Sequence, residues 1–523
     1  MIVSPHGGTE KHTETRKLFL GRPPLLFFLL SFFFTACSPA RPASDTTIIV
    51  ALANSPTNLD PGVGLDEASQ KLHQLLYRSL LKTDASLRVV PDLASRFETT
   101  DSMNYLAEIP QGVRFHDGRE MTSDDVAFTF RRFLDPAFLS GRKGAYNALA
   151  SVDIVDRYTV MFRLRAPSAS FPINLIMGIV PAGTGPSAAR APIGSGPYRL
   201  AEFVPDDHAT LAPFADAYGG APANGGLMFK VVPDETMRGL ELRKRSVDLV
   251  VNDLSPDLVH GLSQIPTLAV TTAPGTDYAY IGFNLNDPSL KDPRVRWAVA
   301  YAVDTTAIVE HLRRGLARLT TSIVPSMSWA FEENVKHFSH DPVEARRLLD
   351  EAGFRDPDGD GPLPRLRLTL KTSTDERYRL QAAVIQQNLA DVGIDLDVRS
   401  YEFATLMSDV IRGNVQLYTL QFVGVTDPDM LRRAFHSSQT PPAGFNRGHY
   451  GNPQVDALID RAGLALKEDD RRVLYGQIQQ LVAEDAPYVS LWAKTNLAVA
   501  QRDLQGITLS PTADFAFLKN VHR

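Results

Sequence analysis

The stretch PQGVRFHDG at residues 110–118, followed by MTSDDVAFTF at residues 121–130, contains a clear helix start. Thr122-Ser-Asp-Asp125 is typical of a helix N-terminus, because a threonine hydroxyl and an acid three residues later can both bond to backbone N–H groups. Apolar side chains then recur at helical spacing, at Val126, Phe130, Phe133 and Leu134. The stretch therefore predicts a capped amphipathic helix with one buried face.

The same alternation of short apolar runs and amphipathic helices continues on both sides of this stretch. Strand-like runs occur at 48–52, 366–370, 396–398 and 417–422. Helical spacing occurs in four further groups: Leu72, Leu75, Leu76 and Leu80; Val295, Ala298, Val299 and Ala302; Ala345, Leu348, Leu349 and Ala352; and Val455, Leu458, Ile459 and Ala462. Because helices and strands are interleaved throughout, the pattern predicts an α/β fold.

The composition of the chain excludes several classes of protein. The 523 residues are 44% hydrophobic and 22% charged, which is ordinary for a folded globular protein and excludes a disordered chain, a collagen and a polytopic membrane protein. The formal net charge of −6 does not indicate a basic surface, so we expect no nucleic-acid partner.

The N-terminus reads as an export signal. Four basic residues in the first 24 precede the apolar run LLFFLLSFFFTA at 25–36, whose helix of about 18 Å is too short to span a bilayer core of about 30 Å. Residues 34–37, FTAC, resemble the bacterial lipobox, in which the cysteine is lipidated after cleavage. We therefore predict a lipoprotein signal at 1–36, lipidation of Cys37 and a polar tether at 37–46. The alternative is cleavage elsewhere, with Cys37 incidental.

Motifs for catalysis and metal binding are missing from the sequence. It has no Gly-x-Ser-x-Gly elbow, Walker loop or His-Glu-x-x-His helix, and its one cysteine is Cys37. His436 and His449 lack a metal-ligand spacing. Residues 356–361 start like a calcium loop, but Arg367 stands where the closing glutamate belongs, so we expect a solvated turn. We predict that the protein is not an enzyme and binds no cofactor or metal.

Two segments combine aromatic and polar side chains. In GTDYAYIGFN, 275–284, alternation along an extended chain places Tyr278 and Tyr280 on one face. FNRGHY, 445–450, combines acceptor, donor and stacking groups. From the residues alone, a ligand-binding role and ordinary strand packing with a capped turn both stay open.

The ordered motifs carry a resemblance to a known family. Residues 110–130 resemble the signature of bacterial family 5 extracellular solute-binding proteins, the dipeptide- and oligopeptide-binding proteins of ABC importers. Further similar stretches follow in the family's order: IGSGPY 193–198, DPRVRWAVAYAVD 292–304, DPVEARRLLDEAG 341–353, QQNLADVGI 386–394, DPD 427–429 and YGNPQVD 450–456. The resemblance extends from about Ala51 to Trp492.

The resemblance implies a two-lobed, type II periplasmic-binding-protein-like fold with hinge strands. Lobe one, with an extra subdomain, is expected at 47–275 plus 488–523, and lobe two at 276–487. It also implies a monomeric, periplasmic or extracytoplasmic lipoprotein, anchored to a membrane through Cys37. This protein would capture a peptide or peptide-like solute by closing its cleft and deliver it to ABC permease subunits. An exported ligand-binding sensor, or a binder of a non-peptide solute such as a nickel chelate or a glycoside, stays open.

The inferred hinge positions place the two aromatic segments beside the cleft. The expected ligand-binding residues are Tyr278, Tyr280, Asn284, Asp427, Asn446, Arg447, Tyr450 and Trp492. The chain departs from the family at Gly424, where peptide-binding members hold the peptide's ammonium with an aspartate, and at 371–373, where no carboxylate-binding arginine stands. Because an unpaired buried ammonium is costly, we expect a ligand with a blocked or absent amino terminus, unless Asp427 substitutes as the anchor.

Overall fold

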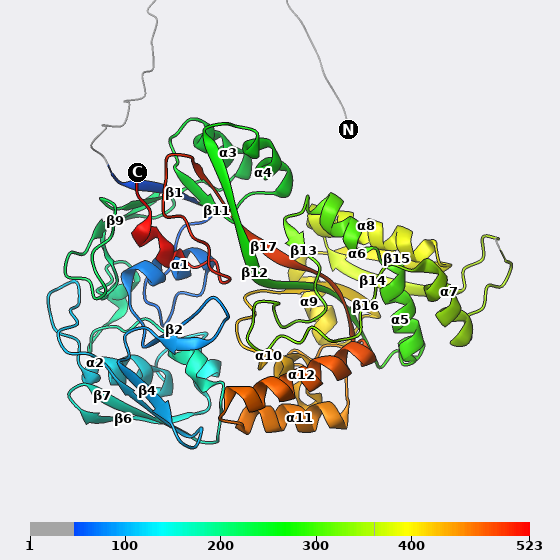
Figure 1. The fold of residues 1–523 in the computed structure, drawn as a ribbon, viewed down its shortest axis with the longest axis horizontal. Coiled ribbons are helices and arrows are strands. Elements are labelled where there is room, and N and C mark those ends of the chain that lie inside the picture. Colours follow the sequence, from blue (N-terminus) through cyan, green and yellow to red (C-terminus); the bar gives the residue numbers. More distant parts are fainter. Residues whose placement is uncertain (1–45, 360) are drawn as a thin grey trace, which may run out of the picture. The chain divides into compact units, whose positions relative to one another are not determined.

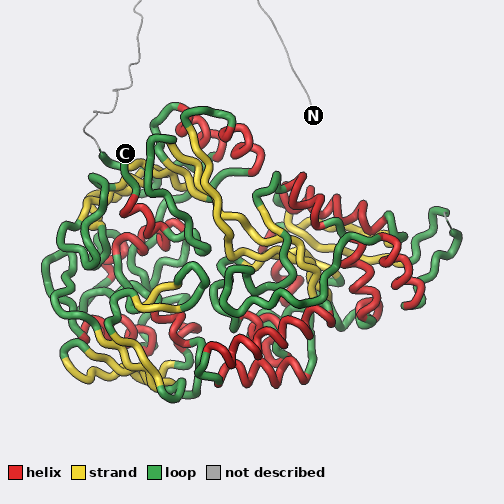
Figure 2. Tube along the Cα trace, in the orientation of Figure 1, coloured by secondary structure: helices red, strands yellow, loops and turns green. Residues whose placement is uncertain are grey.

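The computed structural model describes residues 46–359 and 361–523 (Figure 1). The expected signal, Cys37 and nearly all of the expected tether lie outside these ranges. Within them, no helix is both long enough and apolar enough to cross a membrane. The predicted α/β class is confirmed, with helices packed on a mixed sheet (Figure 2).

One large sheet organises the described part of the chain. Its eleven strands follow the order β15-β14-β16-β12-β17-β11-β1-β10-β9-β8, with β13 paired to β17. Their bounds are β1 Ile48–Leu52, β8 Tyr198–Val204, β9 His208–Pro213, β10 Leu227–Val231, β11 Leu249–Val251, β12 Leu268–Phe283, β13 Ala317–Arg318, β14 Leu366–Ser373, β15 Ile394–Tyr401, β16 Leu417–Phe422 and β17 Tyr488–Gln501. The runs expected at 48–52 and 417–422 match β1 and β16.

Strands β12 and β17 are the continuous connection between the two halves of this sheet. They pair antiparallel from Leu268–Gln501 to Gly282–Tyr488, with a register shift between Pro274 and Tyr278. In one half β17 also pairs with β11, and in the other β12 also pairs with β16. Gly275 lies at the crossing, where a Cβ would stand 2.9 Å from the Lys494 carbonyl oxygen. The two lobes named below keep the boundaries expected from the sequence.

Lobe one carries a second, smaller layer that forms its extra subdomain. A four-stranded sheet has the order β4-β5-β7-β6, and β2 pairs with β3. The bounds are β2 Leu81–Thr83, β3 Val89–Pro91, β4 Arg96–Thr99, β5 Asn104–Glu108, β6 Leu149–Asp156 and β7 Thr159–Leu164. The subdomain has its own core, in which the side chains of Phe115, Met121, Phe130 and Phe162 are fully buried.

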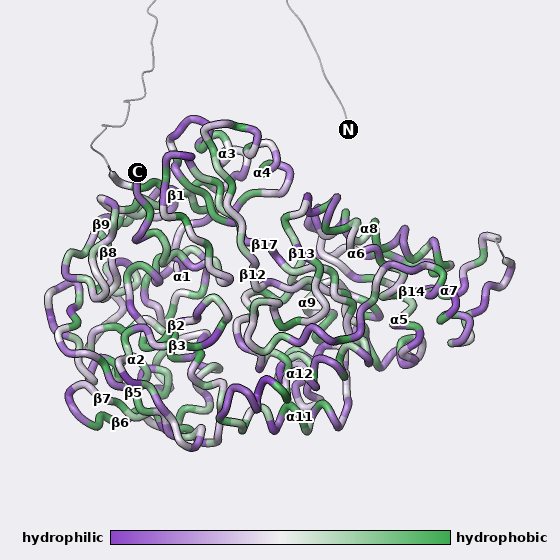
Figure 3. Tube along the Cα trace, in the orientation of Figure 1, coloured by the Kyte–Doolittle hydropathy of each residue, from purple (hydrophilic) through white to green (hydrophobic). Residues whose placement is uncertain are grey.

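Twelve α-helices within the described ranges cover the sheets and the gaps between them. Their bounds are α1 Glu67–Leu76, α2 Ser123–Arg131, α3 Glu235–Arg243, α4 Pro256–Ser263, α5 Pro293–Ala302, α6 Thr305–Ala307, α7 Pro342–Glu351, α8 Glu376–Ala390, α9 Phe403–Ile411, α10 Met430–Phe435, α11 Pro453–Leu464 and α12 Glu468–Asp485. Figure 3 shows hydrophobic segments along the central strands and hydrophilic ones in outer loops such as the one after α7.

The stretch at 110–130 forms a turn followed by helix α2, and the predicted helix start after Thr122 is confirmed. The helix is shorter than the spacing predicts, because α2 ends at Arg131 and Phe133 and Leu134 lie in a short 3-10 helix. The Thr122 N–H donates to Asp125 Oδ2 over 2.8 Å. His116 joins this turn to the IGSGPY segment: its backbone N–H donates to the Gly194 carbonyl over 2.8 Å, and its Nδ1 accepts from the Gly194 N–H over 3.2 Å. Its Nε2 lies 3.2 Å from the Gly196 carbonyl oxygen. Burial lowers the pKa of His116 to about 4, so the ring is neutral and donates through Nε2–H.

Candidate binding cleft between the lobes

A cavity of about 160 Å³ takes its walls from both lobes, and we call it the hinge crevice. Lobe one supplies residues that follow β11, lobe two supplies the start of α8 and the end of β16, and β17 also lines the cavity. The lining includes Asn252, Ser255, Arg313, Arg377, Tyr378, Gln421, Trp492 and Lys494. Because these walls belong to parts that only two strands connect, a change in the angle between the lobes would open or close this space.

A second cavity, of about 650 Å³, lies mainly against lobe one, and we call it the lobe-one basin. Its lining runs from the end of α1 through Tyr77 and Arg78 to the C-terminal segment 508–520, and lobe two contributes Thr426. Arg78 is already paired with Asp92 at 2.9 Å. The basin therefore faces the lobe-two segment that follows β16.

The extra subdomain and neighbouring lobe-one loops touch lobe two along one rim. The Trp329 N–H donates to the Ser86 carbonyl over 3.0 Å, and the Ala169 N–H donates to the Gly463 carbonyl over 3.1 Å. Arg88 of lobe one pairs with Glu468 of α12 at 2.9 Å. Figure 1 shows α11 and α12 beside the subdomain. These bonds hold the two lobes in contact in the structure.

Gly424 lies beside a carboxylate that sequence reasoning missed. Its φ is +68°, and its N–H donates to Asp277 Oδ1 over 2.9 Å. Asp277 Oδ2 also accepts from the Gln421 side-chain amide over 2.9 Å and lies 3.4 Å from Lys494 Nζ. The signal was present in the sequence, because Asp277 belongs to the 275–284 segment. The hinge strand thus brings an acid to the position opposite Gly424.

Trp492 lines the hinge crevice, so it lies between the lobes. Its indole Nε1–H donates to Gln381 Oε1 over 2.8 Å, and the Arg313 guanidinium carbon lies 3.9 Å from its ring centre. Tyr278 belongs to a different apolar cluster, on the other face of the sheet. The structure therefore separates these two predicted site residues.

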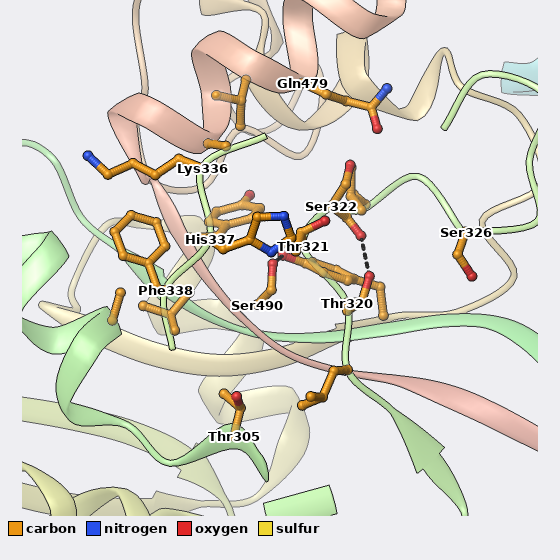
Figure 4. Close-up of a pocket in the computed structure, with 18 of the residues that line it drawn as sticks. Thr305, Thr320, Thr321, Ser322, Ser326, Lys336, His337, Phe338, Gln479 and Ser490 are labelled. Atoms are coloured by element: carbon orange, nitrogen blue, oxygen red, sulfur yellow. Dashed lines mark hydrogen bonds between the residues drawn. The ribbon is translucent and has the colours of Figure 1, made fainter. Parts of the chain in front are cut away.

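Tyr278 lines a cavity of about 390 Å³ whose walls, over the described residues, all belong to lobe two and the start of β17 (Figure 4). Its hydroxyl lies 2.8 Å from Ser490 Oγ. Figure 4 shows hydroxyl side chains around this space, with Thr320 bonded to the Ser322 carbonyl over 3.0 Å, and His337 beside them. The cavity is polar on one side and does not lie between the lobes.

Tyr280 and Arg447 meet inside lobe two. Tyr280 is fully buried between Tyr488 and Phe422, with ring centres 4.2 and 5.1 Å away. Arg447 Nη1 donates to the Tyr280 hydroxyl over 3.2 Å, and its guanidinium lies over the Phe445 ring at 5.1 Å. Burial raises the pKa of Tyr280, so the hydroxyl stays protonated. Neither residue lines the cavities described above, and their ligand-binding role stays a prediction.

Asn284, Asn446 and Tyr450 bind backbone or side-chain groups of lobe two. The Asn446 side chain donates to the Tyr450 carbonyl over 2.7 Å and accepts from the Tyr450 N–H over 2.9 Å. Asn284 Nδ2 donates to the Val415 carbonyl over 2.9 Å. The Tyr450 hydroxyl donates to Asp485. In the structure these side chains brace turns, and a contact with ligand stays a prediction for them too.

Asp427 opens the turn that leads into α10. Its Oδ1 accepts from the Asp429 N–H over 2.7 Å. Burial raises the pKa of Asp427, although the charge of Arg471 opposes this. Burial, together with the Asp427 charge, raises the pKa of Asp429 to about 6. The pair follows Thr426, so it lies close to the lobe-one basin.

No group of three or more histidine, cysteine or acidic residues within the described ranges could hold a metal ion. Loop 356–359, which resembles the start of a calcium loop, is a bend. Arg365 pairs with Asp356 at 3.3 Å there.

Two lobes on a shared sheet, with a crevice at the strands that connect them, define a two-lobed binding protein of the type II class. Comparison with known proteins identifies the family. The model of the bacterial extracellular solute-binding proteins, family 5, matches residues 88–441 through its middle region. The chain belongs to this family, and the predicted resemblance and fold are confirmed.

Similar proteins cover nearly the whole chain. The oligopeptide-binding protein AppA of Bacillus subtilis is 28% identical over 94% of this chain and 96% of its own length. Its structure in complex with a nonapeptide superposes with a TM-score of 0.72 and covers 91% of this chain and 98% of that one. A probable di/tripeptide-binding protein of Pseudomonas aeruginosa is 29% identical over 92% of this chain and 96% of its own.

A third relative binds a different ligand. NikZ from Campylobacter jejuni, whose structure is in complex with Ni(L-His), is 25% identical, with a TM-score of 0.74 and coverage of 92% of this chain and 100% of that one. Family 5 proteins are extracytoplasmic solute-binding proteins, so the predicted location outside the cytoplasm is confirmed at that level.

Proposed function

We propose that the protein is the substrate-binding component of an ABC importer and captures a peptide or peptide-like solute between its lobes. One observation carries the proposal: the hinge crevice has walls from both lobes, at the two strands that connect them. A solute that touches both walls makes its full set of contacts in the closed state, and it therefore shifts the equilibrium towards closure. The permease would then recognise the closed form.

The similarity to peptide-binding relatives supports a peptide as the substrate class. At residue 424, however, glycine provides no carboxylate, and the neighbouring Asp277 already accepts bonds from Gly424 and Gln421 and lies beside Lys494. A free ammonium would have to compete with these partners. We therefore expect a peptide with a blocked amino terminus, or a non-peptide solute, to bind better than a free dipeptide. The NikZ relative keeps the second alternative open.

The remaining parts of the proposal concern the setting of the protein. We infer that the chain is anchored to a membrane through lipidated Cys37, acts as a monomer and catalyses no reaction. The ligand would make its contacts at Trp492, with Asp427 as a further predicted contact. Tyr278, Tyr280 and Arg447 stay predictions, and in this structure they lie apart from the hinge crevice. The lobe boundaries at 275/276 and 487/488 are part of the same proposal.

Native mass spectrometry of the protein purified from its own host should reveal a co-purified solute and its mass. Calorimetry with one tripeptide, free and N-acetylated, then tests the preference. We expect the acetylated form to bind at least as tightly as the free form. Binding of the free form that is tenfold tighter, and is lost in Asp427→Asn or Asp277→Asn, would instead identify an ordinary peptide binder and its ammonium anchor. A protein that carries no solute and binds neither peptide would contradict a peptide substrate.

A further inference from the structure

The hinge crevice contains three cationic side chains, and two of them have acidic partners. Arg377 donates to both oxygens of Asp375, with Nε to Oδ1 at 3.1 Å and Nη2 to Oδ2 at 2.8 Å. Lys494 Nζ lies 3.4 Å from Asp277 Oδ2. Arg313, the third, has no ion pair and no side-chain hydrogen bond to any residue of 46–359 or 361–523. Its donors therefore remain available.

Packing holds the Arg313 guanidinium in place. It lies over the Trp492 ring, 3.9 Å from the ring centre, and Trp492 is itself fixed by its hydrogen bond to Gln381. A cation above an indole face is stabilised, but the interaction leaves the in-plane N–H donors of the guanidinium unused. Although burial lowers the pKa of Arg313 to about 10, the side chain stays charged at neutral pH. The crevice thus contains a half-buried, oriented cation whose donors have no acceptor.

The position of this cation suits a ligand rather than a structural role. Arg313 is on lobe two, and the lobe-one segment that includes Asn252 and Ser255 lines the same crevice. The charge of Asp375 favours the Arg313 cation, but Asp375 accepts its hydrogen bonds from Arg377. A half-buried guanidinium without a hydrogen-bond acceptor is costly to a protein, and an anionic group that enters the crevice would supply that acceptor. A planar guanidinium pairs well with a carboxylate, which it can bind through two parallel N–H donors. The crevice, at about 160 Å³, is small enough to favour a single carboxylate of the ligand.

We propose that Arg313 is a specificity-determining residue that binds a carboxylate of the transported solute in the hinge crevice. The proposal deepens the proposed function and rests on it, because it names the chemical group of the solute that closes this part of the cleft. Trp492 orients the guanidinium, and Arg377 and Lys494 add positive potential while they keep their own acidic partners. The solute class is thereby narrowed to molecules with at least one free carboxylate.

Two probes test the proposal on the purified protein: sodium acetate, and N-acetyl-trialanine compared with its C-terminal amide. Arg313→Gln removes the cation, and Arg379→Gln on the exposed face of α8 is the matched control. We expect acetate, at constant ionic strength against chloride, to raise the melting temperature of the wild type and the control by a measurable amount, with no rise in Arg313→Gln. We expect the wild type to bind the acid at least about tenfold more tightly than the amide, and Arg313→Gln to lose this difference.

Each outcome decides a separate question. Equal acetate shifts in the wild type and Arg313→Gln, or an acid-to-amide preference that survives in Arg313→Gln, would overturn the carboxylate role. So would the absence of both effects in the wild type. An acetate shift that requires Arg313, without binding of either peptide, would support the carboxylate site and overturn the peptide substrate. A melting temperature of ligand-free Arg313→Gln close to that of the wild type would show that the variant folds.

Discussion

His116 provides a test of how the signature turn is held to the rest of lobe one. In the folded protein its Nδ1 accepts from the Gly194 N–H, and its Nε2–H donates to the Gly196 carbonyl. Burial lowers its pKa from 6.5 to about 4. Protonation would place a second N–H against the Gly194 N–H, so the charged ring does not fit this site.

The magnitude follows from the pKa. A group with a folded-state pKa below its unfolded value of 6.5 contributes its full stability above pH 6.5 and loses it as the pH falls towards 4. A drop from 6.5 to about 4 corresponds to about 3 kcal/mol as an upper limit, and about 2 kcal/mol is a fair expectation for a half-buried ring. In His116→Asn, the amide oxygen can still accept from Gly194 but the bond to Gly196 is lost, which costs about 1 kcal/mol at pH 7.5.

We therefore expect the stability curves of the wild type and His116→Asn to converge or cross between pH 7.5 and 4.5. Urea unfolding followed by circular dichroism, with hydrogen exchange of the 110–118 and 193–198 segments, measures the difference. His73, whose pKa burial also lowers to about 4, is present in both proteins and cancels. His260→Asn, at an exposed site on α4, is the control. A difference between wild type and His116→Asn that stays constant with pH would refute the reasoning.

Three further predictions concern other parts of the chain. Cys37→Ala should move the protein from the membrane fraction to the soluble fraction, and a variant that stays membrane-bound would contradict lipid attachment. Arg447→Ala should weaken binding of the identified solute by about 10- to 150-fold in calorimetry if Arg447 contacts it, and an unchanged Kd would remove it from the site. Asp429→Asn should stabilise the protein by about 1–2 kcal/mol at pH 8, because burial raises the Asp429 pKa to about 6 and its charged form is then disfavoured. The gain should vanish near pH 4 in thermal melts, and a gain independent of pH would contradict this reading.

The local elements could be read from the sequence, because hydrophobic periodicity reports which face of a segment is buried. Strands β1 and β16 and helices α5, α7 and α11 fall where the spacing predicts them. The site was harder to predict, because the pairing of β12 with β17 decides which of their side chains share a face of the sheet. Trp492 pairs with Ala279 and Tyr278 pairs with Ala493, so Trp492 and Tyr278 lie on opposite sides of the sheet, and no local pattern reveals this register.

Arg313 and Asp277 were missed for the same physical reason. Arg313 follows a helical segment and reads as a solvated charge, because its contact with Trp492 joins positions far apart in the chain. Asp277 lies inside the segment that the sequence singled out, but its bonds to Gly424 and Gln421 depend on the pairing of β12 with β16. Residues whose contacts join distant parts of the chain could therefore be identified only from the structure. The departure from the family at Gly424 could be identified from the sequence motif alone.

Strand β17 has a consequence for how the chain matures. It lies between β12 and β11 in the sheet, so β12 cannot be joined to the other lobe-one strands until residues 488–523 have been synthesised. Because synthesis starts at the N-terminus, most of lobe one is present long before β17, the strand that completes its sheet. Pairing between such distant segments is slow. A chain truncated before β17 would therefore leave unpaired strand edges at β11 and β12, and proteases would cleave it more readily than the full chain.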